Sequence, residues 1–335
     1  QHNNHDNSIE SLRLYHIELY HWMMMRVVLM ILLMAFMEMD QVHAISGDSQ
    51  GSTKDATTIE RRSGPWLDGV PTPLPLLSKT RISRDTSIFR FRLPDLDETL
   101  GIGVCSCLLA SLPHDRNVTR PYTPISSRHV KGYFDLLVKR YPNGAMSCAL
   151  HDKLKPGDPI LFWQIPFNIK EQYPFGKPKT IVMLAAGTGI TPMYQALQRL
   201  FGDREKDCND LDTKVYLIYG CRTAGDVYLR KEIESMQRMY PNRFSIVYVL
   251  SDEVDAGPST GNNNDGIKTL VGQHMNKEVL EQVCGSRLLK QKDCRVWICG
   301  PPSFYNDLCG PREQTSKVGG ALRSFGLKPN QVIKF

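Results

Sequence analysis

A short apolar run followed at once by a glycine turn constrains the fold of this chain most strongly. Residues Thr180–Ala186 are continuously apolar, which is typical of a strand buried on both faces of a parallel sheet. The turn Gly187–Pro192 (GTGITP) follows directly, and Met193–Phe201 has apolar residues at helical spacing. Pro192 suits the first turn of that helix, where its missing N–H costs nothing. The pattern predicts a strand, a glycine turn and a helix in succession.

The rest of this half continues the alternation. Further strands are predicted at Val215–Tyr219, Phe244–Leu250 and Val296–Cys299, and a helix at Asp226–Tyr240. Alternating strands and helices indicate a parallel α/β domain, in which ligands gather at the carboxyl ends of the strands. A glycine turn between a buried strand and a helix is the common place for a dinucleotide pyrophosphate.

The half before it has a different periodicity. Ile88–Leu93, Val104–Ala110 and Tyr133–Lys139 alternate apolar and polar residues, and turns rich in Pro, Gly and Asp separate them. Short strands at this spacing predict an antiparallel barrel or sandwich. We therefore expect an α+β chain of two folded domains, at 71–175 and 176–335.

Two segments of the strand-rich half suggest binding. Residues 120–126 (RPYTPIS) bring an arginine, which suits phosphate, close to a tyrosine, whose face suits a flat heterocycle. An edge strand with a solvated arginine explains the same residues. In Gly144–Ser147 (GAMS), Ser147 is expected to cap a short helix whose free N–H groups bind an anion, and an ordinary turn explains it equally well.

In combination, RPYTPIS, GAMS, AAGTGITP and CGPP occur in an order and at spacings that resemble the cytochrome b5 reductase branch of the ferredoxin-reductase-like flavoproteins. The resemblance covers about Lys79–Phe335. It implies an antiparallel FAD-binding β-barrel, a parallel NAD-binding α/β domain, bound FAD, and NADH as donor. A hydride would pass from NADH to flavin N5, and single electrons would then pass to a haem protein such as cytochrome b5.

The resemblance also implies roles for individual residues. Thr123, Thr188 and Cys299 would lie beside the reacting flavin and nicotinamide, and Arg120 would pair with the FAD pyrophosphate. The remaining residues expected to bind a cofactor are Pro121, Tyr122, Leu137, Lys139, Gly144, Met146, Ser147, Gly187, Gly189, Pro192, Asp252, Gly300, Pro301 and Phe335.

This sequence departs from the family pattern at two places. Cys105 and Cys107 replace the glycine and histidine of a Gly-x-His, and the pair is either a redox pair or two small buried residues. The acidic residue that binds the coenzyme ribose is expected where Ser251 stands, with Asp252 next to it. If Asp252 takes that role, NADH is the coenzyme, and otherwise NADPH is tolerated.

Composition narrows the alternatives. A net charge of +6 falls short of a nucleic-acid-binding signature, and the nine cysteines form no CxxC pair for a structural zinc site. We expect no metal and mostly reduced thiols. Two alternatives remain open, namely a reductase for a quinone, oxygenase or desaturase chain, and a membrane-tethered scaffold without turnover.

The amino end carries an apolar segment, 22–39, within an extension at 1–44. Its uninterrupted core, Val27–Met37, is shorter than the usual membrane span of about 20 residues. It is interpreted as a membrane anchor, a cleaved signal or a helix packed on the body of the protein. The polar stretch 45–70 reads as a linker. An anchor would place the catalytic domains on the cytosolic side of the endoplasmic reticulum or the mitochondrial outer membrane.

Overall fold

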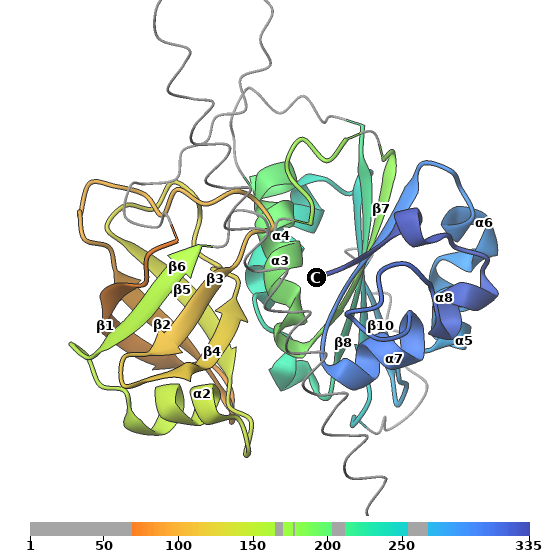
Figure 1. Ribbon diagram of the computed structural model, residues 1–335. Helices are drawn as coiled ribbons and strands as arrows, with labels where there is room; N and C mark the ends of the chain where they lie inside the picture. Colours follow the sequence, from red (N-terminus) through yellow and green to blue (C-terminus); the bar gives the residue numbers. More distant parts are fainter. Residues whose placement is uncertain (1–68, 165–169, 177, 203–211, 254–266) are drawn as a thin grey trace, which may run out of the picture. The chain divides into compact units, whose positions relative to one another are not determined.

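The structure of the chain is a computed structural model that describes residues 69–335 apart from 165–169, 177, 203–211 and 254–266. The N-terminal extension 1–44, with its apolar segment 22–39, and most of the linker 45–70 lie outside the described residues. Element labels follow Figure 1.

The first sheet is antiparallel throughout, in the order β4-β3-β6-β1-β2-β5. Its strands are β1 (Thr72–Arg81), β2 (Thr86–Arg92), β3 (Leu108–Leu112), β4 (Asp115–Tyr122), β5 (Tyr133–Lys139) and β6 (Pro159–Gln164). The alternation predicted for β2 and β5 is confirmed, and Phe89, Phe91 and Phe134 are fully buried on the inner face.

Two expectations for this sheet need correction. The strand predicted at Val104–Ala110 begins only at Leu108, because Cys105 has a φ of 60°, which no strand residue adopts. In the described residues the sheet does not close into a barrel, since β5 meets the segment after β4 only at the isolated bridge between Pro124 and Leu136. Pro121 and Pro124 have no N–H to donate, which prevents a continuous ladder there.

The second sheet is parallel throughout, as predicted, in the order β10-β9-β8-β7-β11-β12. Its strands are β7 (Thr180–Ala186), β8 (Lys214–Cys221), β9 (Phe244–Leu250), β10 (Lys268–Val271), β11 (Cys294–Cys299) and β12 (Val332–Lys334). The chain runs outward from β7 to β10 and then returns to β11 on the other side of β7. The strand order therefore reverses between β7 and β11, which is where open α/β sheets bind ligands.

Helices cover both faces of the parallel sheet (Figure 1). The α-helices are α2 (Ala145–Cys148), α3 (Ile190–Leu197), α4 (Arg230–Met239), α5 (Lys277–Val283), α6 (Gly285–Leu289), α7 (Pro302–Leu308) and α8 (Gly320–Ser324). Short 3-10 segments are η2 (Gly187–Gly189), η4 (Ala224–Asp226) and η5 (Pro329–Gln331), and π segments are η1 (Ala149–Lys153) and η3 (Gln198–Gly202). The helix predicted from Met193 starts at Ile190, so Pro192 does lie in its first turn.

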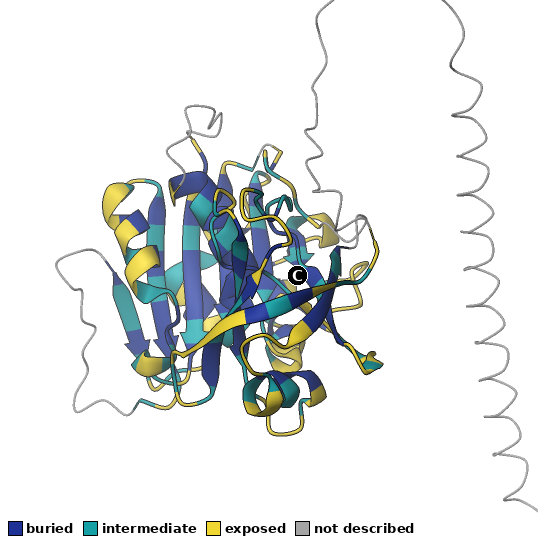
Figure 2. Ribbon diagram, turned by 90° about the vertical axis from the view of Figure 1, so that its left-hand side faces the viewer, coloured by how far each residue is buried: buried dark blue, intermediate teal, exposed yellow. Residues whose placement is uncertain are grey.

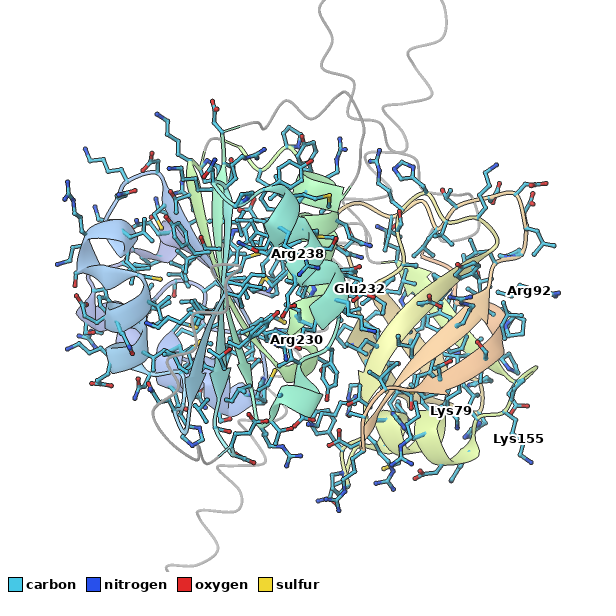
Figure 3. The ribbon with its side chains drawn as sticks, turned by 180° about the vertical axis from the view of Figure 1, so that it is seen from behind. Lys79, Arg92, Lys155, Arg230, Glu232 and Arg238 are labelled. Carbon is cyan, nitrogen blue, oxygen red and sulfur yellow. The ribbon has the colours of Figure 1, made fainter. Side chains whose placement is uncertain are left out.

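Helices α3 and α4 lie between the parallel sheet and the antiparallel sheet (Figures 1 and 3). In Figure 3 the labelled Arg230, Glu232 and Arg238 mark α4. Gln195 of α3 donates from Nε2 to the carbonyl oxygen of Pro124 at 2.9 Å. One apolar cluster also joins Ile125 and Leu137 of the first half to α3, so the two halves share a core.

Burial follows the layers. The strands of the parallel sheet are largely buried, and exposed residues concentrate on the outer helices and turns (Figure 2). Every cysteine in the described residues is a free thiol. Within those same residues no helix is both long and apolar enough to span a membrane.

Candidate functional site

One cleft, of about 740 Å³, runs between the two sheets. It is lined by the RPYT segment, the start of α2, the glycine turn after β7 and the turn after β11. All of the predicted site residues line it except Gly187 and Asp252. Four motifs that are far apart in the sequence thus meet in one place.

The antiparallel sheet contributes side chains to the cleft. Arg120 is exposed on β4, where its Nη1 donates to the neighbouring carbonyl of Thr119 at 2.7 Å. Tyr122 ends the same strand, and burial raises the pKa of its phenol, so the hydroxyl stays neutral. Lys139 ends β5, and its ammonium lies 3.3 Å from a carboxylate oxygen of Asp85. This wall is cationic and partly aromatic.

The start of α2 differs from the expected capping arrangement. Gly144 is the N-cap residue, and Ser147 lies inside the helix. The Ser147 hydroxyl accepts a hydrogen bond from the Tyr141 N–H and donates to the Gly144 carbonyl, both at 3.1 Å. Its oxygen therefore fastens the turn that precedes the helix. Met146 beside it is buried and contributes apolar surface.

The parallel sheet contributes main chain. β7 and β11 are neighbours, so the turn after Ala186 and the turn after Cys299 lie side by side. An added Cβ on Gly189 would lie 2.2 Å from the carbonyl oxygen of Cys299, which leaves no room for any side chain. The Gly187 carbonyl accepts a hydrogen bond from the Tyr219 hydroxyl at 2.9 Å. Only glycine permits this approach of the two turns.

Phe335, the last residue of the described chain, lines the cleft. Its ring lies 5.5 Å from that of buried Trp297, centroid to centroid. Its carbonyl oxygen accepts hydrogen bonds from Arg312 Nε at 2.6 Å and from the Tyr305 hydroxyl. Burial raises the pKa of the nearby Cys299 thiol, so it is a neutral thiol rather than a thiolate.

A buried lysine stabilises a loop that lines the cleft. Lys334 of β12 is 4% exposed, and its ammonium donates to the carbonyls of Gly310, Pro311 and Gln314 at 3.1, 2.8 and 2.9 Å. These carbonyls belong to the loop between α7 and α8. Because Arg312 and Glu313 of this loop line the cleft, Lys334 holds part of the cleft wall from behind.

Two sequence expectations lie outside the cleft. Gly187 lies in the chain between the lining residues Ala186 and Thr188, and its carbonyl accepts the hydrogen bond from Tyr219. Asp252 lies beyond the end of β9, where its N–H donates to the Arg222 carbonyl at 2.8 Å and its carboxylate accepts from Ser251 Oγ at 2.6 Å.

The lining residues that were not predicted include Tyr141, Lys170, Thr191, Tyr305, Asn306, Arg312 and Glu313. Thr191 lies within the GTGITP motif and Tyr305 shortly after CGPP, so membership of a motif or proximity to one was an available signal. Arg312 and Glu313 belong to a segment that reads as a surface loop, and only the three-dimensional fold brings them to the cleft.

Comparison with known proteins identifies the family of this chain. A profile of the FAD-binding domain of oxidoreductases matches residues 73–163, and a profile of the oxidoreductase NAD-binding domain matches residues 183–310. The "NADH-cytochrome b5 reductase 2" of Neurospora crassa is 36% identical over 266 residues, which is 76% of this chain and 70% of that protein. The chain belongs to the NADH-cytochrome b5 reductase family.

Other relatives agree with this membership. The "NADH-cytochrome b5 reductase 2" of Yarrowia lipolytica is 35% identical over 87% of this chain and 91% of its own length. In fold, the cytochrome b5 reductase domain of Ulva prolifera nitrate reductase superposes with a TM-score of 0.63 at 23% identity, covering 81% of this chain and all of that domain. The CS-b5R domains of human Ncb5or give a TM-score of 0.56 at 24% identity, over 78% and 68% of the two chains.

The family expected from the sequence is therefore confirmed, and so is the α+β fold class. The chain is an oxidoreductase with an FAD-binding and an NAD-binding domain, so the expectation of FAD and a nicotinamide coenzyme is also confirmed.

Proposed function

We propose that this reductase passes electrons from NADH, through bound FAD, to cytochrome b5. The observation that carries the proposal is that the RPYT segment, the GTG turn, the CGP turn and Phe335 all line one cleft. The family members it resembles over most of its length carry this activity in their names.

The residues of the cleft fit a flavin dinucleotide. Arg120 and Lys139 supply positive charge for a pyrophosphate, and an arginine fork matches phosphate oxygens well. Leu137, Met146 and Phe335 supply apolar surface for a flat ring system. When bound, the flavin supplies the conversion from two-electron to one-electron transfer, which no side chain performs.

The residues of this chain align the reactants and exclude water. We call the side of the cleft built from the antiparallel sheet and α2 the flavin wall, and the side built from the turns after β7 and β11 the coenzyme wall. Thr123 from the flavin wall, and Thr188 and Cys299 from the coenzyme wall, line the same cleft and are proposed to flank the reacting rings. The neutral Cys299 thiol places no charge beside the nicotinamide. Holding two reactants in a reactive geometry is worth roughly 7–11 kcal/mol of barrier at the upper end.

Preference for NADH is assigned to Asp252. It stands just past the end of β9 with its carboxylate 2.6 Å from Ser251 Oγ, where a negative charge would disfavour a 2′-phosphate.

Flavin absorbance of the full chain tests the proposal. Anaerobic NADH should bleach the bound flavin rapidly and NADPH slowly, and added cytochrome b5 should then be reduced at its haem. Reduction of ferricyanide without reduction of cytochrome b5 would replace the acceptor and keep the reductase. A purified protein without flavin, or a flavin that NADH leaves oxidised, would favour the scaffold alternative. Equal bleaching by both coenzymes would refute the role of Asp252.

We further propose that the apolar segment 22–39 tethers the reductase to a membrane, on the cytosolic side of the endoplasmic reticulum or mitochondrial outer membrane. Support comes from the sequence pattern alone. The full chain should float with phosphatidylcholine vesicles, and a chain that lacks 1–44 should not. Equal flotation of the two proteins would refute the tether.

A further inference from the structure

A buried hydrogen bond joins the antiparallel sheet to the segment that leads into α4. Thr86, the first residue of β2, and Tyr228, between η4 and α4, place their hydroxyl oxygens 2.8 Å apart. The two residues are 1% and 2% exposed. The Thr86 hydroxyl also lies 3.1 Å from a carboxylate oxygen of Asp85, which only accepts. The single Thr86 proton therefore goes to Asp85. The Tyr228 hydroxyl lies 2.8 Å from the Thr86 hydroxyl oxygen and 3.5 Å from a carboxylate oxygen of Asp226, so we assign its proton to the shorter contact with Thr86.

From Asp85 the connection reaches the flavin wall. The other carboxylate oxygen of Asp85 lies 3.3 Å from the Lys139 ammonium, which lines the cleft. The same oxygen lies 4.0 Å from the guanidinium of Arg222, at the end of the parallel sheet. Tyr228 is thus connected to a cation of the flavin wall through two intervening side chains.

In the other direction the connection reaches the coenzyme wall. The Tyr228 N–H donates to the hydroxyl of Tyr219 at 3.4 Å, and Tyr219 in turn donates to the Gly187 carbonyl at 2.9 Å. Tyr219 is fully buried on β8, and Gly187 immediately precedes the lining residues Thr188 and Gly189. Tyr228 is therefore linked to both walls of the cleft.

The backbone beside Tyr228 is held in an uncommon conformation. Leu229 has a φ of 57°, in the left-handed region that residues other than glycine rarely adopt. This residue turns the chain from Tyr228 into α4. Such conformations persist where the surrounding structure requires them, and they gather at functional sites. Tyr228 belongs to the apolar cluster that joins the two halves, and Leu229 packs against the same cluster.

We propose that Tyr228 is a positioning residue that holds the flavin wall and the coenzyme wall in register for transfer between nicotinamide and flavin. The inference rests on the proposed function. Neither Tyr228 nor Thr86 lines the cleft, so their effect is on alignment rather than on direct contact with a cofactor. Small misplacements of reacting groups cost large factors in rate.

Substitution of the two hydroxyl partners in the full chain tests the proposal. Tyr228→Phe keeps the ring and removes only the hydroxyl. We expect the anaerobic rate of flavin bleaching by NADH to fall about tenfold, as the loss of one hydrogen bond at a barrier implies. FAD content and the KM for NADH should stay within about twofold, and NADH deuterated at the transferred position should show a larger isotope effect than with the wild type.

Two substitutions of Thr86 distinguish a hydrogen-bonding role of the Thr86–Tyr228 pair from a packing role. Val matches the shape of Thr without the hydroxyl, and Ser keeps the hydroxyl with less bulk. We expect Thr86→Val to behave like Tyr228→Phe, and Thr86→Ser to keep the wild-type rate. The double variant Tyr228→Phe with Thr86→Val should be no slower than either single variant. Tyr216→Phe, on the same strand as Tyr219 but packed on the other face of the sheet, is the matched control and should match the wild type.

The outcomes are distinct. A Tyr228→Phe variant with full FAD and the wild-type bleaching rate overturns the positioning role and leaves the proposed function intact. A wild-type flavin that NADH does not bleach overturns the proposed function itself. If Tyr228→Phe loses FAD, the two Thr86 variants provide the test instead. A wild-type bleaching rate in Thr86→Val together with a lowered rate in Thr86→Ser would overturn the proposal, because it would mean that packing rather than the hydrogen bond matters.

Discussion

The two walls of the cleft are built on different principles. The flavin wall presents side chains from antiparallel strands, with Arg120 and Tyr122 on β4 and Lys139 on β5. The coenzyme wall presents main chain from two turns, and an added Cβ on Gly189 would lie 2.2 Å from the Cys299 carbonyl. On the flavin side the comparable contact, from Gly144, is to the side-chain oxygen of Ser147 at 2.4 Å. A change on the flavin wall should therefore weaken binding, whereas a change on the coenzyme wall should damage the fold.

The largest effect is expected from Gly189→Ala. Backbone atoms of the two turns cannot both stay in place, so we expect the free energy of unfolding to fall by about 3 kcal/mol or more. Gly187→Ala is the matched control in the same turn. Gly187 has a φ of 53° but nothing within 4 Å of its added Cβ, so the cost should be the conformational one of about 1–2 kcal/mol. Equal losses in urea denaturation would mean that the close contact is not what requires glycine.

Lys334→Met should have the next largest effect. It removes the donor shared by three carbonyls of the loop after α7, and unsatisfied buried groups cost roughly 1–3 kcal/mol. Because this loop carries Arg312 and Glu313, the affinity for NADH should fall as well. The exposed Lys290→Met is the control and should stay within about 0.5 kcal/mol of the wild type in urea denaturation. A Lys334→Met protein of wild-type stability would show that the loop does not need this charge.

Arg120→Ala tests the other half of the comparison. Arg120 is exposed and its described contact is to the adjacent Thr119, so the fold should survive. Loss of a charge-assisted bond to phosphate, worth about 1.5–3 kcal/mol, should weaken FAD affinity about tenfold to a hundredfold in fluorescence titration. Arg116→Ala, on the same strand outside the cleft, should bind FAD as the wild type does. A destabilised Arg120→Ala protein with normal FAD affinity would reverse the proposed division between the walls.

Periodicity in the sequence predicted several strands of both walls correctly. Strands β5, β7 and β9 fall on the residues that periodicity predicted, because their burial patterns follow directly from alternation or continuous apolarity. The motifs predicted the turns that line the cleft, since a glycine turn after a buried strand has few alternatives, but they did not predict the loop that carries Arg312 and Glu313. The strand expected from Val104 was wrong because the φ of Cys105 depends on its contacts, including one to the Pro192 carbonyl 87 residues away.

Residues outside the motifs were not predicted, because their environments also depend on contacts with residues far away in the sequence. Lys334 looks like an ordinary surface lysine in the sequence, and it is buried only because the loop after α7 folds back over β12. Serine is a residue type that often caps helices, but the Ser147 hydroxyl accepts from the Tyr141 N–H instead and so stabilises the preceding turn. Local sequence describes local preference, and long-range contacts decide which of the available partners a polar group takes.

The smallest effect is expected from His151, behind the flavin wall. Burial lowers the pKa of its imidazole, and the ring lies 2.9 Å from the Val138 carbonyl and edge-on to Phe89. The folded state therefore favours the neutral ring, and the unfolded state, with an ordinary pKa near 6.5, binds more protons at mildly acid pH. The stability that this group contributes is present above about pH 6.5 and is lost as the pH falls through the lowered value. Thermal unfolding midpoints from pH 7.5 to 5.5 should decline less steeply for His151→Gln than for the wild type, while Gly189→Ala should keep the wild-type slope. Parallel slopes for His151→Gln and the wild type would mean that the ring is not held neutral, and that the flavin wall, like the coenzyme wall, owes its stability to packing rather than to a titrating side chain.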